Sequence, residues 1–529
     1  MENLSSPQSK GVVSAGDAQT AEAGKIILEQ GGNAFDAVVA SGFAAFVCEV
    51  ALCGPLGGGV MLAKTAQGTT QSVEFFGRTP GLGGPQPSQL DFGEETIDFG
   101  VTTQSFKVGK GAAALGLALP GLVDIHKKWG RLPLHRVAEP AVRLGRDGFV
   151  VGAPMAYILE LISPIFSWTP ESKALVHIDG RLPTAGERMF NADLATVLED
   201  IADNPSELQG LYADFARHFG PSQGGLITAR DLTSYEIEYA DPIAVRMRDW
   251  SLATMPSPSS GGSLIALGLR LLEGLGDDTR FLSLDHLVQV ALTQRMLLDV
   301  RTPEFDEQLR DPAFIKSLLS RSNVNRLREC LARPPIARPD NHLGSTTQIS
   351  VIDKEGGVAA MTLTNGEGCG CVIPGTGIEV NNLLGEADIN PRGFHCDPPG
   401  TRMSTMMAPT VGLNGQGDLI ALGSGGSNRL RNAIMMTLCN LIEYGCSPAD
   451  AVSAPRLHLD ASDGDFELNV EVAEHHDDML DGLREVFPKL VRFPGRNMFF
   501  GGVHTALSLN GQLSGIGDAR RGGCSAIAR

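Results

Sequence analysis

The sequence contains little positive charge, few aromatic side chains and no hydrophobic run long enough to cross a membrane. Its 43 lysines and arginines stand against 61 aspartates and glutamates, a formal net charge of −18, and 6% of its residues are aromatic. Because phosphate binding depends on clustered basic side chains, this balance argues against a nucleic-acid or anionic-membrane partner. The most hydrophobic stretch, residues 37–48, is shorter than the ~20 residues of a spanning helix and predicts buried core.

Cysteine and histidine are present, but not in the spacing of a metal site. Nine cysteines, an odd number, cannot all pair within the chain, and none shows C-x-x-C spacing. The EHHDD cluster at residues 474–478 favours a charged surface, because adjacent histidines point to different faces of a helix. The first ten residues are polar and lack the pattern of a secretory signal. These features predict a reduced, cytoplasmic chain without metal or cofactor.

Glycine is abundant, with 64 residues among 529, and its clusters mark the ends of the expected elements. Gly31-Gly32 ends a helix at residues 21–30, and Asn33 caps the next one. The pattern from about residue 110 to 330 is mainly helical. A proline-rich segment at residues 333–340 (RPPIARPD) predicts an extended linker, after which strands predominate. We expect one layered α/β unit rather than two independent domains.

The linker leads into Gly344, Ser345 and a pair of threonines. A threonine hydroxyl is a poor nucleophile unless a base lies beside it, and its own α-amine, with a pKa of ~7.7–8.0, suits that task. An internal Thr346 gains this amine only if the Ser345–Thr346 bond is cut. The alternative is that this tetrapeptide simply begins a strand.

A turn at residues 353–357 (DKEGG) predicts a hairpin between the strands that flank it. If Ile352 pairs with Val358, the same register places Thr364 opposite Thr346. A second hydroxyl would then lie within hydrogen-bonding distance of the nucleophile. The alternative is a cross-strand threonine pair that only stabilises the sheet.

A glycine-rich loop at residues 423–427 (GSGGS) follows an expected strand at 419–422 and precedes an expected helix. Backbone N–H groups at such a helix start attract anions, so Gly425 and Gly426 could form an oxyanion hole. The loop is neither a nucleotide-binding P-loop nor a G-x-S-x-G nucleophile elbow. The alternative is a plain tight turn.

These motifs together resemble the γ-glutamyltranspeptidases, or glutathione hydrolases, of the N-terminal nucleophile superfamily. The resemblance covers nearly the whole chain and implies a four-layer αββα sandwich. It rests on residues 31–37 (GGNAFDA), 56–59 (LGGG), 118–121 (ALPG), 141–148 (AVRLGRDG), 255–262 (MPSPSSGG) and 346–353 (TTQISVID).

Carried over residue by residue, the resemblance assigns Thr346 as a nucleophile freed by autocleavage after Ser345, and Thr364 as its supporting threonine. A large subunit, 1–345, and a small subunit, 346–529, would result. The other implied site residues are Arg78, Ser404 and Thr405 for the substrate α-carboxylate, Gly425 and Gly426 for the oxyanion, and Asn382 beside the α-amine pocket.

The chain departs from the family in the pocket for the glutamyl α-amine. Leu383 replaces a Gln or Glu, Glu386 occupies an aspartate position, and Glu367 lies in a changed TNGEG segment. We expect a γ-glutamyl hydrolase or acyltransferase that acts on glutathione-like amides, with Glu386 and Glu367 as candidates for the substrate ammonium. The alternatives are an acylase for another carboxylate-bearing amide, or an unprocessed homologue that only binds small acids. The sequence leaves the acyl donor, the acceptor and the oligomeric state open.

Overall fold

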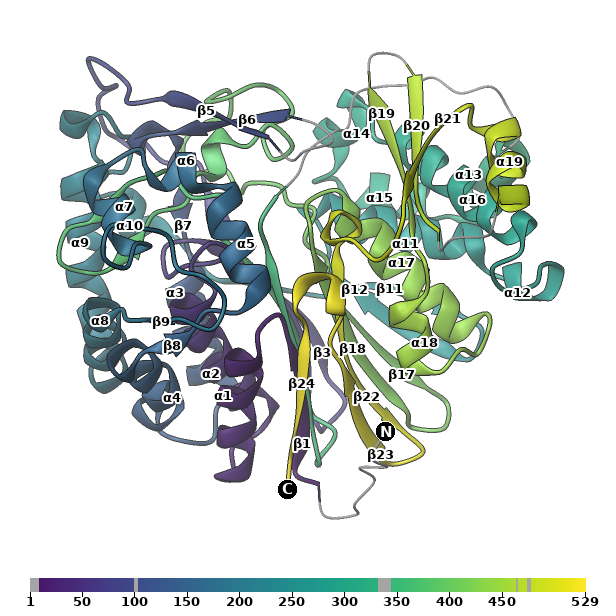
Figure 1. The fold of residues 1–529 in the computed structure, drawn as a ribbon, viewed down its shortest axis with the longest axis horizontal. Coiled ribbons are helices and arrows are strands. Elements are labelled where there is room, and N and C mark those ends of the chain that lie inside the picture. The colour runs from purple at the N-terminus through teal and green to yellow at the C-terminus, as the bar shows by residue number, and fades with distance from the viewer. Residues whose placement is uncertain (1–8, 99–102, 332–343, 463–464, 473–476) are drawn as a thin grey trace.

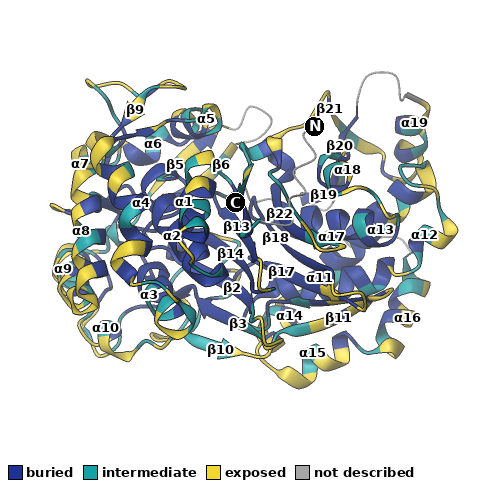
Figure 2. Ribbon diagram, turned by 90° about the horizontal axis from the view of Figure 1, so that it is seen from below, coloured by how far each residue is buried: buried dark blue, intermediate teal, exposed yellow. Residues whose placement is uncertain are grey.

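The computed structural model has two central β-sheets packed face to face, with helices on the outer face of each (Figure 1). This four-layer αββα arrangement is the predicted one. Figure 2 shows that the sheets and the helices against them are buried, whereas the outer helices expose one side to solvent. The structure describes residues 9–98, 103–331, 344–462, 465–472 and 477–529.

Both sheets are antiparallel between all neighbouring strands and combine strands from before and after residue 345. The first sheet has the order β10 (Glu238–Ala240), β3 (Thr70–Phe75), β2 (Gly58–Lys64), β14 (Val358–Thr364), β13 (Thr347–Asp353), β1 (Gly11–Ala15) and β24 (Cys524–Ala528). The second has the order β11 (Ile243–Met247), β12 (Trp250–Thr254), β17 (Thr410–Asn414), β18 (Leu419–Gly425), β22 (Gly502–Leu509) and β23 (Gln512–Ile516).

Helices α1–α10 lie on the side of the first sheet and α11–α19 on the side of the second (Figure 1). The helices that contact the two central sheets directly are α1 (Ala18–Glu29), α2 (Ala34–Cys48), α3 (Ala118–Trp129), α11 (Ser260–Leu272), α17 (Arg429–Ile442) and α18 (Pro448–Ser453). Helix α13 (Leu284–Val300) packs on α11. The other long helices are α4 (Leu134–Asp147), α5 (Ala153–Leu161), α8 (Ala192–Asp203), α9 (Leu208–Phe219), α16 (Arg321–Cys330) and α19 (Asp477–Val486).

Several smaller sheets lie outside the two central ones. A three-stranded sheet contains β19 (Leu457–Ser462), β20 (Asp465–Glu471) and β21 (Lys489–Phe493). Two-stranded pairs join β4 (Gly77–Arg78) to β7 (Leu115–Gly116), β5 (Gly93–Asp98) to β6 (Thr103–Val108), β8 (Phe149–Val150) to β9 (Arg188–Met189) and β15 (Val372–Ile373) to β16 (Ile378–Glu379).

Helix α2 contains the most hydrophobic stretch of the sequence and is part of the protein core. Every residue of α2 is buried, as predicted for residues 37–48. Asn33 accepts from the backbone N–H groups of Phe35 and Asp36, and the Asp36 carboxylate accepts from the Asn33 N–H in return. Such a capping box contributes about 1 kcal/mol. None of the helices in the described ranges is long and apolar enough to cross a membrane.

Strand β13 separates two hydrophobic cores, one on each face of the first sheet, and its side chains point alternately into one and the other. Ile349 and Val351 pack towards the α1–α2 layer, whereas Ile352 belongs to the core on the other side of the sheet. The Ser350 hydroxyl donates to the carbonyl of His504 on β22. Because successive side chains point to opposite faces, the alternation fixes which threonine at the start of β13 faces which layer.

The structure corrects several predicted boundaries. Helix α1 begins at Ala18, not at residue 21, because Asp17 caps it. Strand β18 continues through Gly425, so the first three residues of the predicted glycine loop are strand. Strand β14 begins at Val358, directly after the predicted turn. The proline-rich linker at 333–340 and residues 474–476 of the histidine cluster lie outside the described residues.

Candidate active site

Thr346 lies directly before β13, and its hydroxyl belongs to a short relay. With the Ser345–Thr346 peptide bond in place, Thr346 Oγ1 donates to Thr364 Oγ1 over 3.4 Å. Thr364 Oγ1 in turn donates to the carbonyl oxygen of Ser345 over 2.6 Å and accepts from the N–H of Gly366 over 3.0 Å. All these side chains are buried. The relay therefore joins the candidate nucleophile to the carbonyl that precedes it.

The relay follows from the hairpin register. Ile352 pairs with Val358 and Thr347 with Leu363, which is the predicted register. One step further along the same register brings Thr364 to Thr346. Neighbouring strand β2 pairs Gly58 with Thr364, so the threonine lies inside the sheet rather than at its edge. Strand pairing on both sides holds the Thr364 hydroxyl in place.

Gly425, at the end of β18, lies against the backbone of Thr346. A Cβ on Gly425 would come within 2.1 Å of the carbonyl oxygen of Thr346, so no side chain fits there. The next residue, Gly426, has a φ of +116°, which L-residues rarely adopt. The N–H groups of Gly426 and Ser427 donate to no acceptor within the described ranges. This turn can therefore bind an anion beside Thr346.

A cluster of acidic side chains lies beside the Ser345 hydroxyl. The Ser345 hydroxyl donates to Glu367 over 2.7 Å, and the Glu367 N–H donates to the side chain of Asn382 over 2.9 Å. Burial raises the pKa of Glu367 to about 7, although Ser345 and Arg521 oppose the shift. This carboxyl group can hold or release a proton near neutral pH.

Glu386 belongs to the same cluster, and its carboxyl group lies close to Gly366 and Asn382. Its Oε1 lies 2.6 Å from the position of a Cβ on Gly366 and has no hydrogen-bond partner within the described chain. Burial raises the pKa of Glu386 well above its ordinary value, and the nearby Asp388 and Glu367 raise it further. Asp388 accepts from the Ser427 hydroxyl over 2.8 Å. The acidic cluster thus extends to the glycine turn.

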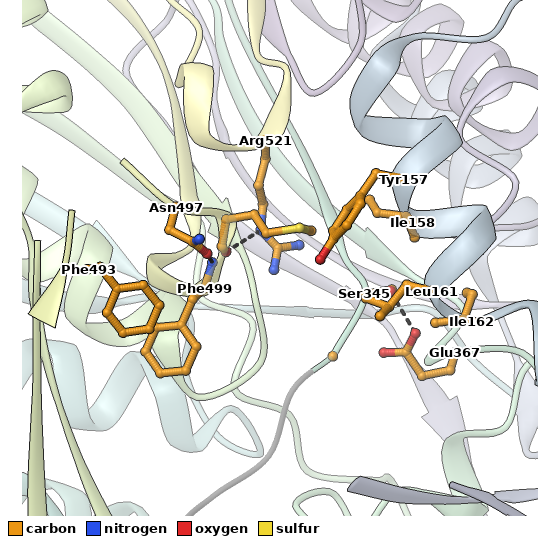
Figure 3. Close-up of a pocket in the computed structure, with 12 residues that line it drawn as sticks. Tyr157, Ile158, Leu161, Ile162, Ser345, Glu367, Phe493, Asn497, Phe499 and Arg521 are labelled. Carbon is orange, nitrogen blue, oxygen red and sulfur yellow. Dashed lines mark hydrogen bonds between the residues drawn. The ribbon is translucent and has the colours of Figure 1, made fainter. Parts of the chain in front are cut away.

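A cavity opens beside Ser345 and contains one cation among mostly apolar walls (Figure 3). Tyr157 and Ile158 of α5 form one wall, and Phe493 and Phe499 form the opposite one. Arg521 points into the space between Tyr157 and Phe499 (Figure 3). The remaining lining residues are Leu161, Ile162, Gly344, Ser345, Glu367, Asn497 and Met498.

A second cavity is lined by Thr346 itself. Thr346, Thr347, Glu49, His504 and Arg521 are among its lining residues. Burial raises the pKa of Glu49 to about 7 and lowers that of His504 to about 4, so the histidine is neutral at physiological pH. Within the described ranges, no group of His, Cys, Asp or Glu side chains could hold a metal ion.

Three residues assigned to the substrate carboxylate line neither cavity. The guanidinium of Arg78 is bound to Glu74 over 3.0 Å and to the carbonyls of Gly77 and Glu236. The Thr405 hydroxyl accepts from the N–H of Met407, and Ser404 is half-buried on the same segment. Printed contacts and the two cavities join Ser345, Thr346, Thr364, Glu367, Asn382, Glu386, Gly425 and Gly426, whereas Arg78, Ser404 and Thr405 line neither of these cavities.

Arg521, Tyr157 and Phe499 form the cavity with Ser345 but are not among the residues predicted from the sequence. None of the three lies in a recognisable motif. Arg521 follows Arg520 and precedes Gly522-Gly523, and that pattern alone gives no reason to place it at a nucleophile. Only the folded chain brings the three segments together.

The matches to known proteins extend over almost the whole chain. The family model described as gamma-glutamyltranspeptidase matches residues 20–528. The glutathione hydrolase proenzyme of Escherichia coli K12 is 30% identical over 85% of this chain and 81% of its own length. The acylase ACY 1 proenzyme of Pseudomonas sp. SE83 is 29% identical over 88% and 85%. The crystal structure of cephalosporin acylase from Bacillus halodurans has a TM-score of 0.81, with 22% identity, and covers 98% of this chain and 96% of that one.

Proposed function

This chain belongs to the γ-glutamyltranspeptidase family, and we propose that it is an autoprocessed N-terminal threonine hydrolase and acyltransferase. Thr346 would be the nucleophile, released by cleavage after Ser345. Residues 1–345 and 346–529 would then form a large and a small subunit that stay associated, because both sheets combine strands from the two segments. The proenzyme names of the relatives support this division.

In the proposed maturation step, Thr346 Oγ attacks the carbonyl carbon of Ser345. The peptide C–N bond breaks, the nitrogen takes up the hydroxyl proton, and an ester with a free α-amine remains. Water then hydrolyses the ester and leaves Ser345 as a carboxylate. The 2.6 Å contact between Thr364 Oγ1 and the Ser345 oxygen carries the proposal, since a donor at this carbonyl stabilises the oxyanion that forms there.

In the proposed turnover, the α-amine of Thr346 takes the proton from its own hydroxyl, because an α-amine has a pKa of ~7.7–8.0. The hydroxyl oxygen attacks the amide carbonyl of the donor, the α-ammonium passes its proton to the departing amine, and the acyl group stays as an ester on Thr346. Water or an acceptor amine then removes it. The N–H groups of Gly425, Gly426 and Ser427 are our candidates for the oxyanion hole, supported by the close approach of this turn to Thr346.

A γ-glutamyl amide such as glutathione is the first proposed donor. It carries an α-ammonium, for which Glu386 and Glu367 are candidate partners, and the name of the Escherichia coli relative supports this choice. The unpartnered Oε1 of Glu386 is a buried acceptor of the kind that an ammonium requires. Asn382, which binds the backbone of Glu367, would keep the acidic group in position.

An acylase for a different carboxylate-bearing amide is the second candidate. The apolar walls formed by Tyr157, Ile158 and Phe499 favour it, because a glutamyl group offers them little apolar surface. The name of the Pseudomonas relative supports the same class. An unprocessed chain that only binds small acids would need neither the relay nor the glycine turn.

Intact mass spectrometry followed by a donor series tests the proposal. Two chains that divide between Ser345 and Thr346 are expected, together with an acyl adduct on the smaller one. γ-Glutamyl-4-nitroanilide and glutaryl-4-nitroanilide differ only in the α-amine, so their ratio of kcat/KM separates the two donor classes. A single uncleaved chain that forms no adduct with either donor would refute the proposal and leave the binding homologue.

A further inference from the structure

Arg521 is the one charged side chain that lines both cavities beside Thr346 in the described parts of the chain. It is the last residue of the short helix at Ala519–Arg521 and is far in sequence from the nucleophile. Its neighbour Arg520 points away and is bound to Glu471 and Asp518. The two adjacent arginines therefore have different environments.

The guanidinium of Arg521 has few partners. Its Nε donates to the carbonyl of Met498 over 3.4 Å, and within the described residues Nη1 and Nη2 have neither a hydrogen-bond acceptor nor an ion pair. Burial lowers the pKa of Arg521 to about 10, so it remains a cation at neutral pH. Among acidic groups, Glu367 has the largest electrostatic effect on Arg521, but its own raised pKa leaves it only partly ionised at pH 7. A half-buried cation with free N–H groups favours an anionic ligand.

The position of the Arg521 guanidinium indicates where such an anion would bind. Nη1 lies 3.5 Å from the place of a Cβ on Gly425, and Nη2 lies 3.2 Å from that of a Cβ on Gly426. The carbonyl oxygen of Thr346 touches the same point on Gly425. Figure 3 shows Arg521 directed into the cavity that also contains Ser345. Because Ser345 is the acyl residue on Thr346 before cleavage, this cavity is where a donor acyl group would lie.

We infer that Arg521 binds the carboxylate of the acyl donor and selects monoamides of dicarboxylic acids. The inference rests on the proposed acyl-enzyme at Thr346 and adds the residue that reads the acyl group. Tyr157 and Phe499 would contact the carbon chain while the guanidinium binds its charged end. Arg78, to which the family resemblance assigns a substrate carboxylate, lines neither cavity, and its guanidinium donates to Glu74 and to two backbone carbonyls.

The test compares two donors of equal chain length, glutaryl-4-nitroanilide and pentanoyl-4-nitroanilide, of which only the first carries a carboxylate. Arg521→Gln should lower kcat/KM for the glutaryl donor about ten- to a hundredfold, mainly through KM, because charged hydrogen bonds are lost. The pentanoyl donor should change less than about twofold. Arg521→Lys keeps the charge without the fork and should fall between wild type and Arg521→Gln on the glutaryl donor.

Arg496→Gln is the matched control, since it removes an exposed cation from the segment next to Phe493 and Asn497. It should leave both donors unchanged. Equal losses on both donors in Arg521→Gln would overturn the inference and assign Arg521 to the oxyanion or to folding. Unchanged glutaryl kinetics would overturn it too. If the Gln variant fails to fold, Arg521→Lys must show the donor-specific rise in KM, or the inference fails. If the wild-type protein forms no acyl-enzyme with either donor, the proposed function itself is refuted.

Discussion

The hairpin that presents Thr346 and the cavity beside it are built in opposite ways. Strands β13 and β14 are neighbours in the sequence, and a four-residue turn fixes their register. The cavity combines Tyr157 of α5, Ser345, Phe499 and Arg521, which come from four distant segments. The nucleophile is thus positioned by local structure, whereas the donor preference depends on how the whole chain packs. Substitutions in the two regions should therefore separate catalysis from selectivity.

The largest effect is expected from Thr346→Ala. Without the hydroxyl, no acyl shift can begin, so the protein should remain a single chain with no measurable turnover. Intact mass and a denaturing gel measure the first, and release of nitroaniline from γ-glutamyl-4-nitroanilide measures the second. A variant that still divides after Ser345 would show that another group attacks this bond.

Thr347→Ala is the matched control for that experiment. The Thr347 side chain is also buried, but it faces the α1–α2 layer near Gly16 and Glu49. Its hydroxyl lies beside the Glu49 carboxyl group rather than in the chain of hydrogen bonds from Thr346 through Thr364 to the Ser345 carbonyl. Cleavage should therefore proceed as in the wild-type protein. A block in both variants would indicate that the start of β13, not the hydroxyl of Thr346, is what processing requires.

Thr364→Ala should have the next largest effect. It removes the donor to the Ser345 carbonyl and the acceptor for Thr346, and a positioned proton-handling group contributes ~10²–10⁴-fold. Turnover of processed enzyme should fall by about 10²-fold, measured as kcat. Thr362→Ala is the control, because Thr362 lies two residues earlier on β14 and donates to Gln348 instead. Processed Thr364→Ala with wild-type kcat would exclude the role.

The sequence was informative about the first region because its signals are local. The turn residues at 353–357 predicted the hairpin of β13 and β14 and its register, and Asn33 predicted the start of α2. The glycine turn was only partly predicted, because β18 pairs with β22 and extends through Gly425. Strand extension of this kind depends on a partner strand that is distant in the sequence.

The second region could not be predicted from sequence patterns. Arg78 matches a family position, but its guanidinium is held by Glu74, a contact that depends on the path of β3 and β4. Arg521 has no motif around it and gains its place only because the C-terminal segment returns beside Gly425. A single aromatic or charged residue outside a motif carries no signal about which distant residue it will contact in the folded chain. Residue type predicts chemistry here, but not location.

Glu386→Gln sharpens the comparison within the donor site itself. If Glu386 binds the substrate ammonium, the change should raise KM for γ-glutamyl-4-nitroanilide about tenfold, the loss of one charged hydrogen bond, and spare the glutaryl donor, which has no α-amine. Because burial keeps the pKa of Glu386 high, the wild-type KM for the γ-glutamyl donor should also fall as pH rises and the group ionises.

Two measurements can contradict this role of Glu386. Equal losses on both donors would assign Glu386 to structure and favour the acylase. A γ-glutamyl KM that keeps its pH dependence in Glu386→Gln would attribute that dependence to another group, with Glu367 as the first candidate. Glu367→Gln would then be the next variant to test, by the same pair of donors.

The smallest effect on activity is expected from a buried carboxyl group away from both cavities. Glu379 on β16 accepts from the Ser172 hydroxyl and the Gly370 N–H, and burial raises its pKa to about 8. Since the unfolded group ionises near pH 4.5, its contribution to stability is fully present below that pH and is lost as the pH rises to about 8. Glu379→Gln should therefore stabilise the protein at pH 8, by roughly 1–3 kcal/mol, but not at pH 4.5, with kcat unchanged. Urea unfolding at both pH values measures this, with exposed Glu171→Gln as the control; equal stability of Glu379→Gln and wild type at pH 8 would mean that Glu379 ionises normally in the folded protein.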